Sequence, residues 1–454
     1  MKQDTNEAIY DARVFGVPKM MVLGFQHMFA MFGATVLVPA LTGLSVSATL
    51  LFAGLGTLLF HFLTKGKVPA FLGSSFAYLA GYAAIAPNGE KELLPYACAG
   101  VACSALLYFI LAGLIKAFSV EKVMKFFPPI VTGPIIIAIG LTLSASAITN
   151  CSADWLVAIV AIVIVIACNI WGKGMIRIIP IILGVLGSYA VGALRHDVDF
   201  SAIRDAAWIG LPFHMNDTVF SIFQNLDSTL LINAIITIMP IALATMVEHI
   251  GDICAISSTV GKNFIKDPGL HRTLCGDGAA TLIASLFGAP ANTTYGENTG
   301  VLSLTKVFDP RVIRIAAYLA ILFSFSPKFA AVVSSMPTAT IGGVSLVLYG
   351  MISAVGVRNL VENHVDFSKS RNVIIAALIL VLAIGIKYFN ASGAISFTIG
   401  TVTISLTGLA VAAVIPVSGK TNGSLSGCHG AWHCNGNGRE HYLCTVTGSV
   451  DENG

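Results

Sequence analysis

Charged residues are scarce in this chain. Only 11% of its 454 residues are charged and 56% are hydrophobic, whereas a soluble domain carries about 25% charged residues. This shortage excludes a disordered chain and an ordinary cytosolic enzyme. The net charge of +3 is too small to indicate a nucleic acid or another anionic partner. We therefore expect a protein that lies mostly in membrane lipid.

Several motifs are absent as well. The chain has no GxxxxGK[ST] phosphate loop, no HExxH zinc motif and no GxSxG nucleophile motif, so ATP-driven transport and membrane hydrolysis have no support. We expect no enzyme activity, no metal and no cofactor. Most of the nine cysteines lie in or beside apolar runs, where they act as small hydrophobes. The polar first 16 residues do not resemble a signal peptide, so the first span is expected to insert uncleaved.

Long apolar runs with short polar breaks dominate the rest of the chain. Since about 20 apolar residues cross a bilayer as a helix, they predict fourteen membrane spans. The spans lie near residues 17–41, 46–64, 68–85, 93–118, 127–149, 155–171, 178–194, 230–250, 273–290, 291–307, 313–334, 336–357, 372–391 and 396–416.

The basic residues test this count. With the N-terminus in the cytoplasm, 21 of the 26 Lys and Arg residues fall on the cytoplasmic side. The other side holds Lys91, Arg195, Arg204, Lys328 and Lys387. The positive-inside rule predicts such a bias, and an error in the count would scramble it. Both termini are therefore predicted to be cytoplasmic.

Two of the runs are poor helices. Residues 68–85 contain Gly and Ser near their start, and residues 289–304 (APANTTYGENTGVLSL) are more polar still. They occupy the third position in each set of seven spans. Interrupted spans at matching places in two halves indicate a transporter's binding site, because irregular backbone must line a protein-enclosed cavity. The alternative is that each is a re-entrant or surface loop.

Ionisable residues inside spans are functional candidates, because burying charge in lipid is costly. Glu248 and His249 close the predicted eighth span, and Asp252 follows Glu248 at i+4 on the same face. Asp277 lies early in the ninth span. The alternatives are a structural pair for Glu248, and for Asp252 and Asp277 a position at the membrane interface.

Glu297 is the strongest candidate. It lies in the broken tenth span among Gly296, Asn298 and Gly300, where free backbone N–H groups can point at a ligand. His27, in the first span, is expected to form a hydrogen bond between helices rather than to bind a ligand. Together these residues describe a polar site in mid-membrane, as in a secondary transporter. A channel would instead place polar rings along several spans.

Two segments fall outside the spans. Residues 195–229 form a long outer loop with two short stretches that look like amphipathic surface helices, the alternative being an extended linker. Residues 418–454 are rich in Gly, Asn, Cys and His and lack apolar periodicity. Their Cys and His spacing matches no known zinc motif, so we interpret this segment as a disordered tail that is not native to the fold.

Several motifs resemble the nucleobase–ascorbate transporter family, also called the nucleobase:cation symporter-2 family, and within it the bacterial uracil permeases most closely. They include QHMFAMFGATVLVP (26–39), VPAFLGSSFAY (68–78), EHIGD (248–252), PANTTYGENTGVLSLTKVFDP (290–310) and GGVSLVLYG (342–350). The family signature, an acidic or amide residue followed by N-x-G-x4-T and a basic residue, is matched by Glu297, Asn298, Gly300, Thr305 and Lys306. The resemblance covers residues 14–416 and not the tail.

The resemblance implies an all-α membrane fold of fourteen segments in two inverted seven-span repeats, with short strands in broken spans 3 and 10. It implies a core domain made of residues 1–126 (spans 1–4) and 230–335 (spans 8–11). It also implies a gate domain made of residues 127–194 (spans 5–7) and 336–417 (spans 12–14). A homodimer through the gate domain is expected on the same ground.

The resemblance also implies roles for individual residues. Glu248 and Glu297 would hold the base, and Phe76 and Gly296 would offer backbone N–H groups, with the Phe76 ring beside the base. Ala34 would line the pocket and Tyr295 would support it.

Other polar residues would serve the proton or the core. Glu248, Asp252 and Asp277 are expected to take part in proton coupling, and His27, Asn298 and Thr305 to be structural polar residues of the core. One departure is Asp252, which stands where some uracil permeases have a histidine linked to coupling.

The resulting expectation is a symporter that imports uracil with protons across the cytoplasmic membrane. An ionised carboxylate only accepts hydrogen bonds, which suits the two N–H donors of uracil. A xanthine or other purine carrier of the same fold is the alternative. Sodium coupling and an anion carrier of the same architecture are further alternatives.

Overall fold

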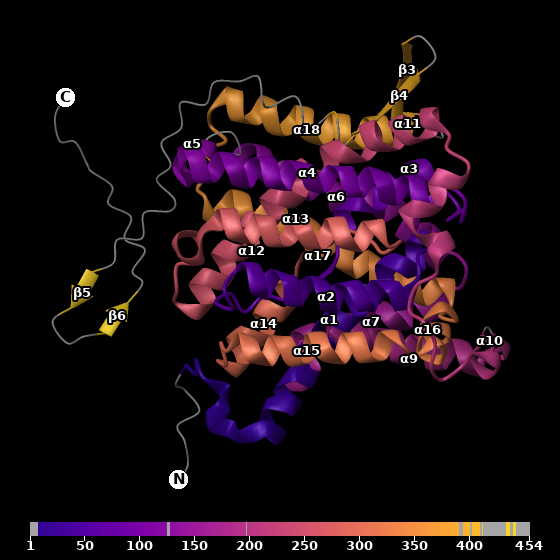
Figure 1. The fold of residues 1–454 in the computed structure, drawn as a ribbon, viewed down its shortest axis with the longest axis horizontal. Coiled ribbons are helices and arrows are strands. Elements are labelled where there is room, and N and C mark those ends of the chain that lie inside the picture. Colours follow the sequence, from indigo (N-terminus) through magenta and orange to yellow (C-terminus); the bar gives the residue numbers. More distant parts are fainter. Residues whose placement is uncertain are drawn as a thin grey trace.

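The computed structural model describes residues 8–124, 128–196, 198–389, 394–399, 402–408, 411, 433–435 and 439–441. Long helices run side by side through most of these residues (Figure 1). Seven helical segments among them are long and apolar enough to cross a membrane, and one sharply bent helix pair would be an eighth. The expected helical membrane fold is thereby supported, whereas fourteen spans are not reached by these criteria.

Many helices coincide with the predicted spans. The long ones are α1 (Gly16–Thr42), α2 (Val46–Leu63), α4 (Leu94–Phe118), α6 (Pro129–Cys151), α17 (Thr338–Glu362) and α18 (Ser370–Phe389). The shorter ones are α7 (Trp155–Trp171), α9 (Pro180–Leu194) and α13 (Leu270–Leu286). Four shorter helical pieces adjoin them. The piece η1 (Ala12–Phe15) precedes α1, α5 (Val120–Met124) follows α4, α8 (Met175–Ile178) precedes α9, and η6 (Ile265–Gly269) precedes α13.

Local signals set several helix ends. The Asp154 side chain accepts from the backbone N–H of Leu156 and Val157 at the start of α7, which satisfies donors that have no partner inside the helix. At the other end of α1, Gly43 adopts a φ of 80° and donates to the Pro39 carbonyl, a left-handed ending that favours glycine.

Proline lies inside one predicted span and breaks another. The predicted span 230–250 falls within one apolar helical stretch, Ser228–Val260, which comprises α11 (Ser228–Ile238), the turn η5 (Met239–Ile241) with Pro240, and α12 (Ala242–Val260). Instead of one straight span over 313–334, α15 (Pro310–Ser324) and α16 (Pro327–Ser334) meet at 89°. Proline lacks the N–H donor and clashes with the preceding turn, which accounts for the break before Pro327.

The prediction of a helical span over 396–416 is wrong for the described residues. Strands β3 (Ala394–Ile399) and β4 (Val402–Thr407) form an antiparallel hairpin there. Apolar Ile395, Phe397 and Ile399 alternate with Ser396 and Thr398. This period of two, with β-branched residues, favours a strand over a helix.

The helices pack in two groups. One contains α1, α2, α4, α13 and α15, and the other contains α6, α7, α9, α17 and α18. Small residues allow close approach within the second group: a Cβ on Gly140 of α6 would lie 2.3 Å from the Tyr349 carbonyl oxygen of α17. Such contacts are typical of helices that pack in membranes.

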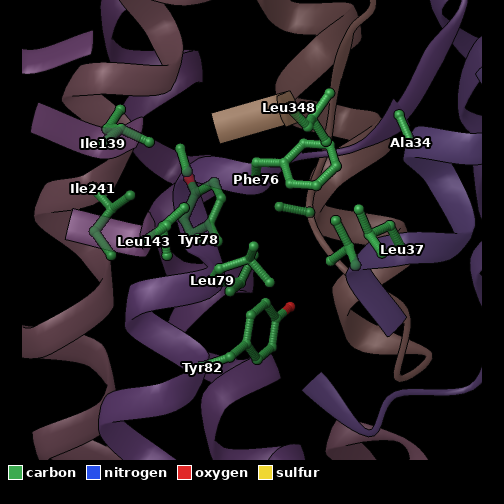
Figure 2. Packing of buried hydrophobic residues seen from close by; sticks show 14 of the residues in the cluster. Ala34, Leu37, Phe76, Tyr78, Leu79, Tyr82, Ile139, Leu143, Ile241 and Leu348 are labelled. Atoms are coloured by element: carbon green, nitrogen blue, oxygen red, sulfur yellow. The ribbon is translucent and has the colours of Figure 1, made fainter. Parts of the chain in front are cut away.

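The third predicted span, 68–85, lies between these two groups of helices. After strand β1 (Leu72–Ser74) it forms the turn η2 (Phe76–Tyr78) and the short helix α3 (Leu79–Ile85). Figure 2 shows Phe76, Tyr78, Leu79 and Tyr82 among apolar residues of α1, α6 and α17. The Phe76 ring lies beside Leu348 and makes an edge contact with Tyr349, at 6.4 Å between ring centroids.

The segment predicted as an outer loop contains short helical pieces. They are α10 (Ser201–Asp205), η3 (Met215–Asp217) and η4 (Val219–Gln224). Helix α10 overlaps the first stretch predicted as amphipathic (202–211) and η4 overlaps the second (218–226), whereas η3 lies between them. Trp208, Ile209 and Leu211 between them are more than 70% exposed. Most of the predicted tail, 418–454, lies outside the described residues, apart from the hairpin of β5 (His433–Asn435) and β6 (Arg439–His441).

Candidate functional site

Two short strands from distant parts of the chain pair with each other within the first helix group. Strand β1 pairs antiparallel with β2 (Asn292–Thr294), with Leu72 opposite Thr294 and Ser74 opposite Asn292. The pairing continues where Ser75 N donates to Ala291 O (2.8 Å) and Tyr295 N donates to Phe71 O (3.1 Å). Helical turns begin directly after each strand, at Phe76 and at Gly296.

One threonine from a neighbouring helix anchors each strand. The Thr57 hydroxyl of α2 accepts from Leu72 N (2.9 Å), and the Thr281 hydroxyl of α13 accepts from Asn292 N (3.2 Å) and donates to Asn292 O (2.8 Å). The backbone groups at the start of each strand are therefore satisfied inside the bundle, as buried polar groups must be.

Replacing either threonine by valine should destabilise the protein. Thr57→Val and Thr281→Val keep the side-chain shape but leave a buried N–H without its acceptor, at a cost of about 1–3 kcal/mol. We expect a lower unfolding temperature in detergent for both variants, to a similar degree. Thr149→Val is the matched control, because its hydroxyl bonds the carbonyl four residues earlier, as that of Thr57 does, but lies exposed. Anchoring is contradicted if all three variants unfold alike.

Tyr295, the residue after β2, connects the two strands through a hydrogen bond to β1. Its hydroxyl donates to Ser74 O (2.8 Å) and lies 3.4 Å from the Thr35 hydroxyl of α1. A Cβ on Gly73 would lie 2.5 Å from the Tyr295 ring and 2.7 Å from the Thr35 hydroxyl. Because Gly73 in the first broken span has no side chain, the Tyr295 ring of the second broken span can pack on the Gly73 backbone.

Helix α14 (Gly296–Thr305) carries Glu297 in its first turn. The first N–H groups of a helix have no partner within it, and they favour negative charge nearby. Asn298, the next residue, is buried and donates to His27 O (3.1 Å), with the His27 Nδ1 at 3.2 Å. Asn298 and His27 therefore fix α14 against α1. At the other end of α14, the Thr305 hydroxyl donates to Val301 O (2.9 Å).

Glu248 lies in the interior of α12 rather than at the end of a span, because that helix continues to Val260. Glu248 is partly buried and close enough to Glu297 for their charges to interact. One turn later, the Asp252 carboxylate accepts a hydrogen bond of 2.7 Å from Thr294 of β2. The α12 face that carries Glu248 and Asp252 therefore adjoins the second strand and α14.

His249 faces the other way, into the bundle. Its Nδ1 lies 3.4 Å from Asp277 Oδ2 of α13, and neither side chain is exposed. Asp277 is therefore buried in the first helix group and does not meet water at an interface. Of the acidic residues on α12, Asp252 contacts strand β2 and Glu248 lies near Glu297 of α14.

A cavity of about 350 Å³ lies between the two helix groups, with Glu297 in its wall. On the side of the first group, α1 and the adjoining α14 contribute Phe29, Ala30, Gly300, Val301, Ser303 and Leu304. On the side of the second group, the cavity is closed by residues of α7, α9, α17 and the adjoining α8, among them Asn169, Arg177, Ile181 and Met351. The cavity thus follows α14 from its acidic first turn toward its C-terminal end.

The sequence and the fold were compared with known proteins. The model of a permease family matches residues 18–392. A uracil permease of Bacillus subtilis is 38% identical over 405 residues, which cover 86% of this chain and 89% of that protein. A uracil permease of Escherichia coli is 37% identical over 406 residues, covering 87% and 89%. The chain belongs to this permease family.

Solved structures support the fold. The transmembrane domain of a cyanobacterial bicarbonate transporter, BicA, superposes with a TM-score of 0.61 at 14% identity, covering 84% of the permease and 97% of that domain. The murine anion transporter Slc26a9 gives 0.57 at 11% identity, covering 92% and 72%. At these identities the similarity concerns the fold alone. Membership of a permease family and the apolar helices make the chain an integral membrane transporter, as expected, and not an enzyme.

The structure brings some predicted site residues together and leaves others apart. Tyr295, Glu297 and Asn298 follow β2 directly, and Glu248 and Asp252 face them from α12. Only Glu297 of these lies in the cavity wall. Phe76 and Ala34 belong to the apolar cluster of Figure 2, and Asp277 is buried with His249.

Several residues of this permease site were not predicted from the sequence. Thr57, Thr281 and Thr294 hold the strands and Asp252, and Arg177 lines the cavity. A lone threonine in an apolar helix most often bonds the carbonyl four residues earlier, so its sequence position carries no signal for a second partner.

Proposed function

We propose that this permease imports uracil across the cytoplasmic membrane together with protons. The observation that carries the proposal is the pairing of β1 with β2. Directly after β2, the first turn of α14 brings Glu297 near Glu248 and into the wall of the cavity. Relatives that are 37–38% identical over nearly the whole chain are uracil permeases, which supports this choice of substrate.

Uracil has two N–H donors, which suit two carboxylates, and two carbonyl acceptors, which suit the free N–H groups at the starts of two helical turns. In this proposal Glu297 accepts from one ring N–H group through a charge-assisted bond, which is roughly twice as strong as a neutral one. Glu248 accepts from the other ring N–H group and can do so through its carbonyl oxygen after it has bound a proton. Backbone N–H groups at Phe76 and Gly296 donate to its carbonyl groups. The Phe76 ring lies beside the base, Ala34 lines the pocket and Tyr295 supports it through Ser74 and Thr35.

We further propose that the two helix groups move against one another. The core domain comprises residues 1–126 and 230–335, and the gate domain comprises 127–194 and 336–417. The packing of α6, α7, α9, α17 and α18 apart from α1, α2, α4, α13 and α15 supports this division, as does a cavity at their boundary. The paired anchors Thr57 and Thr281, each on the helix before a broken span, support two inverted repeats.

The presence of two carboxylates in one site supports proton coupling. Glu248 and Glu297 carry like charges that interact, and the charged form of a carboxylate is costly to bury. We propose that Glu248 binds the proton and that Asp252 and Asp277 support this step. One proton removes a charge before the core domain moves. The distribution of basic residues supports cytoplasmic termini, and a homodimer through the gate domain is proposed on family resemblance.

Uptake into proteoliposomes tests the substrate. Labelled uracil should accumulate inside when the exterior is more acidic, and unlabelled uracil should compete whereas xanthine, adenine, sulfate and bicarbonate should not. Competition by xanthine but not by uracil would contradict the proposal in favour of a purine carrier. Inhibition by bicarbonate or sulfate alone would favour an anion carrier, as in the structural neighbours.

A further inference from the structure

Residues 9–13, here called the N-terminal strap, lie across the ends of the two helices that carry Glu248 and Glu297. Ile9 forms a parallel bridge with Val307, just after α14. Ile9 N donates to Lys306 O (2.8 Å), and Phe308 N donates to Ile9 O (2.7 Å). In Figure 1 the indigo N-terminal segment lies at the same end of the bundle as α12 and α14.

Tyr10 connects the strap to α12. Its hydroxyl donates to the carbonyl of Val260, the last residue of α12, at 2.8 Å. The last carbonyls of a helix have no partner within the helix, so this bond satisfies one of them. The Tyr10 ring also packs against Phe308, with centroids 5.6 Å apart, and Lys262 Nζ lies 4.3 Å from its centroid.

The strap is also fixed to the start of α15. Ala12 is fully buried, and its N–H donates to Asp309 Oδ2 (2.8 Å). Arg311 Nη1 donates to Asp11 Oδ1 (3.0 Å) and lies 3.4 Å from Asp309 Oδ2. Hydrogen bonds from Arg13, together with the nearby charge of Arg311, lower the pKa of Asp11. The Asp11 carboxyl is therefore ionised at neutral pH and can pair with Arg311.

We propose that Tyr10 and Ile9 are positioning residues, which set the distance between the two substrate carboxylates. Helix α14 has ten residues; the strands hold its start, and the strap holds the chain directly after its end. Tyr10 joins that end to the end of α12. This inference rests on the proposed function, because it assigns the strap a role in holding Glu248 and Glu297 around the base. Binding sites require side chains to be held to within about 0.5 Å.

Two single variants test the strap from different sides. Tyr10→Phe removes only the hydroxyl and keeps both ring contacts, whereas Ile9→Pro removes the N–H that bonds Lys306 O. For each we expect the KM for uracil to rise about two- to tenfold, the effect of one neutral hydrogen bond, with the maximal uptake rate and the unfolding temperature nearly unchanged. Arg13→Gln is the control, because the Arg13 side chain bonds Asp11 and not the ends of α12 or α14.

Hydrogen exchange of residues 296–305 gives a readout that does not depend on the substrate. Both variants should exchange faster than the wild type in this helix, and Arg13→Gln should not. An unchanged KM and unchanged exchange in both variants would overturn the inference, as would a fall in unfolding temperature with an unchanged KM. If the wild type takes up no uracil but both variants speed exchange in α14, the proposed substrate fails and the positioning role stands.

Discussion

Glu297→Gln is expected to weaken uracil binding by at least about tenfold. The substitution keeps the size of the side chain but replaces a charged acceptor by a neutral amide, and hydrogen bonds to charged groups contribute about 1.5–3 kcal/mol. That free energy corresponds to roughly 10- to 150-fold in affinity. Equilibrium binding of labelled uracil to the purified permease in detergent measures it.

The control is Glu362→Gln at the end of α17. Glu362 is exposed and pairs with Arg358, so the same chemical change there should leave binding unaltered. The Glu297→Gln variant is also measured with xanthine, because a purine carrier is the alternative function. If uracil affinity stays unchanged in Glu297→Gln, the carboxylate does not select the base.

Glu248→Gln is expected to abolish accumulation of uracil while exchange of uracil across the membrane continues. The amide resembles the protonated carboxyl but can neither gain nor lose a proton. A gradient of one pH unit corresponds to about 1.4 kcal/mol, which drives roughly tenfold accumulation if one proton moves with each uracil. The variant should reach equal concentrations on both sides, whatever the pH gradient.

Two assays separate the possible results. Steady-state accumulation reports coupling, and counterflow of labelled against unlabelled uracil reports movement of the loaded site without net proton transfer. Glu362→Gln again serves as the control in both assays. Normal accumulation by Glu248→Gln would remove Glu248 from the coupling step, and loss of counterflow as well would assign it to binding alone.

The long apolar runs predicted the helices well, because length and composition suffice to define a span. The predicted runs 46–64 and 93–118 match α2 and α4 within a residue or two. The same reasoning was insufficient at α15–α16, where a run of suitable composition is bent by 89° before Pro327. The predicted span 396–416 is wrong because residues 394–399 and 402–407 form strands. Their apolar and polar residues alternate with the period of a strand.

The site was predictable only in part. Gly73 and the NTTYGEN stretch mark broken spans through their composition, and family resemblance supplied the expectation that short strands meet there. The register, with Leu72 opposite Thr294, joins residues more than 200 positions apart, so no local pattern contains it. The contacts of Tyr10 with Val260 and of Thr294 with Asp252 are likewise set by tertiary packing.

Proton movement during uracil entry tests the central claim most directly. Proteoliposomes containing a pH-sensitive dye are exposed to external uracil without any initial pH gradient. Symport predicts that the interior acidifies as uracil enters, with a wild-type signal that Glu248→Gln lacks. Entry of uracil with no change of internal pH, or accumulation that follows a sodium gradient instead, would contradict proton-coupled uracil import by this permease.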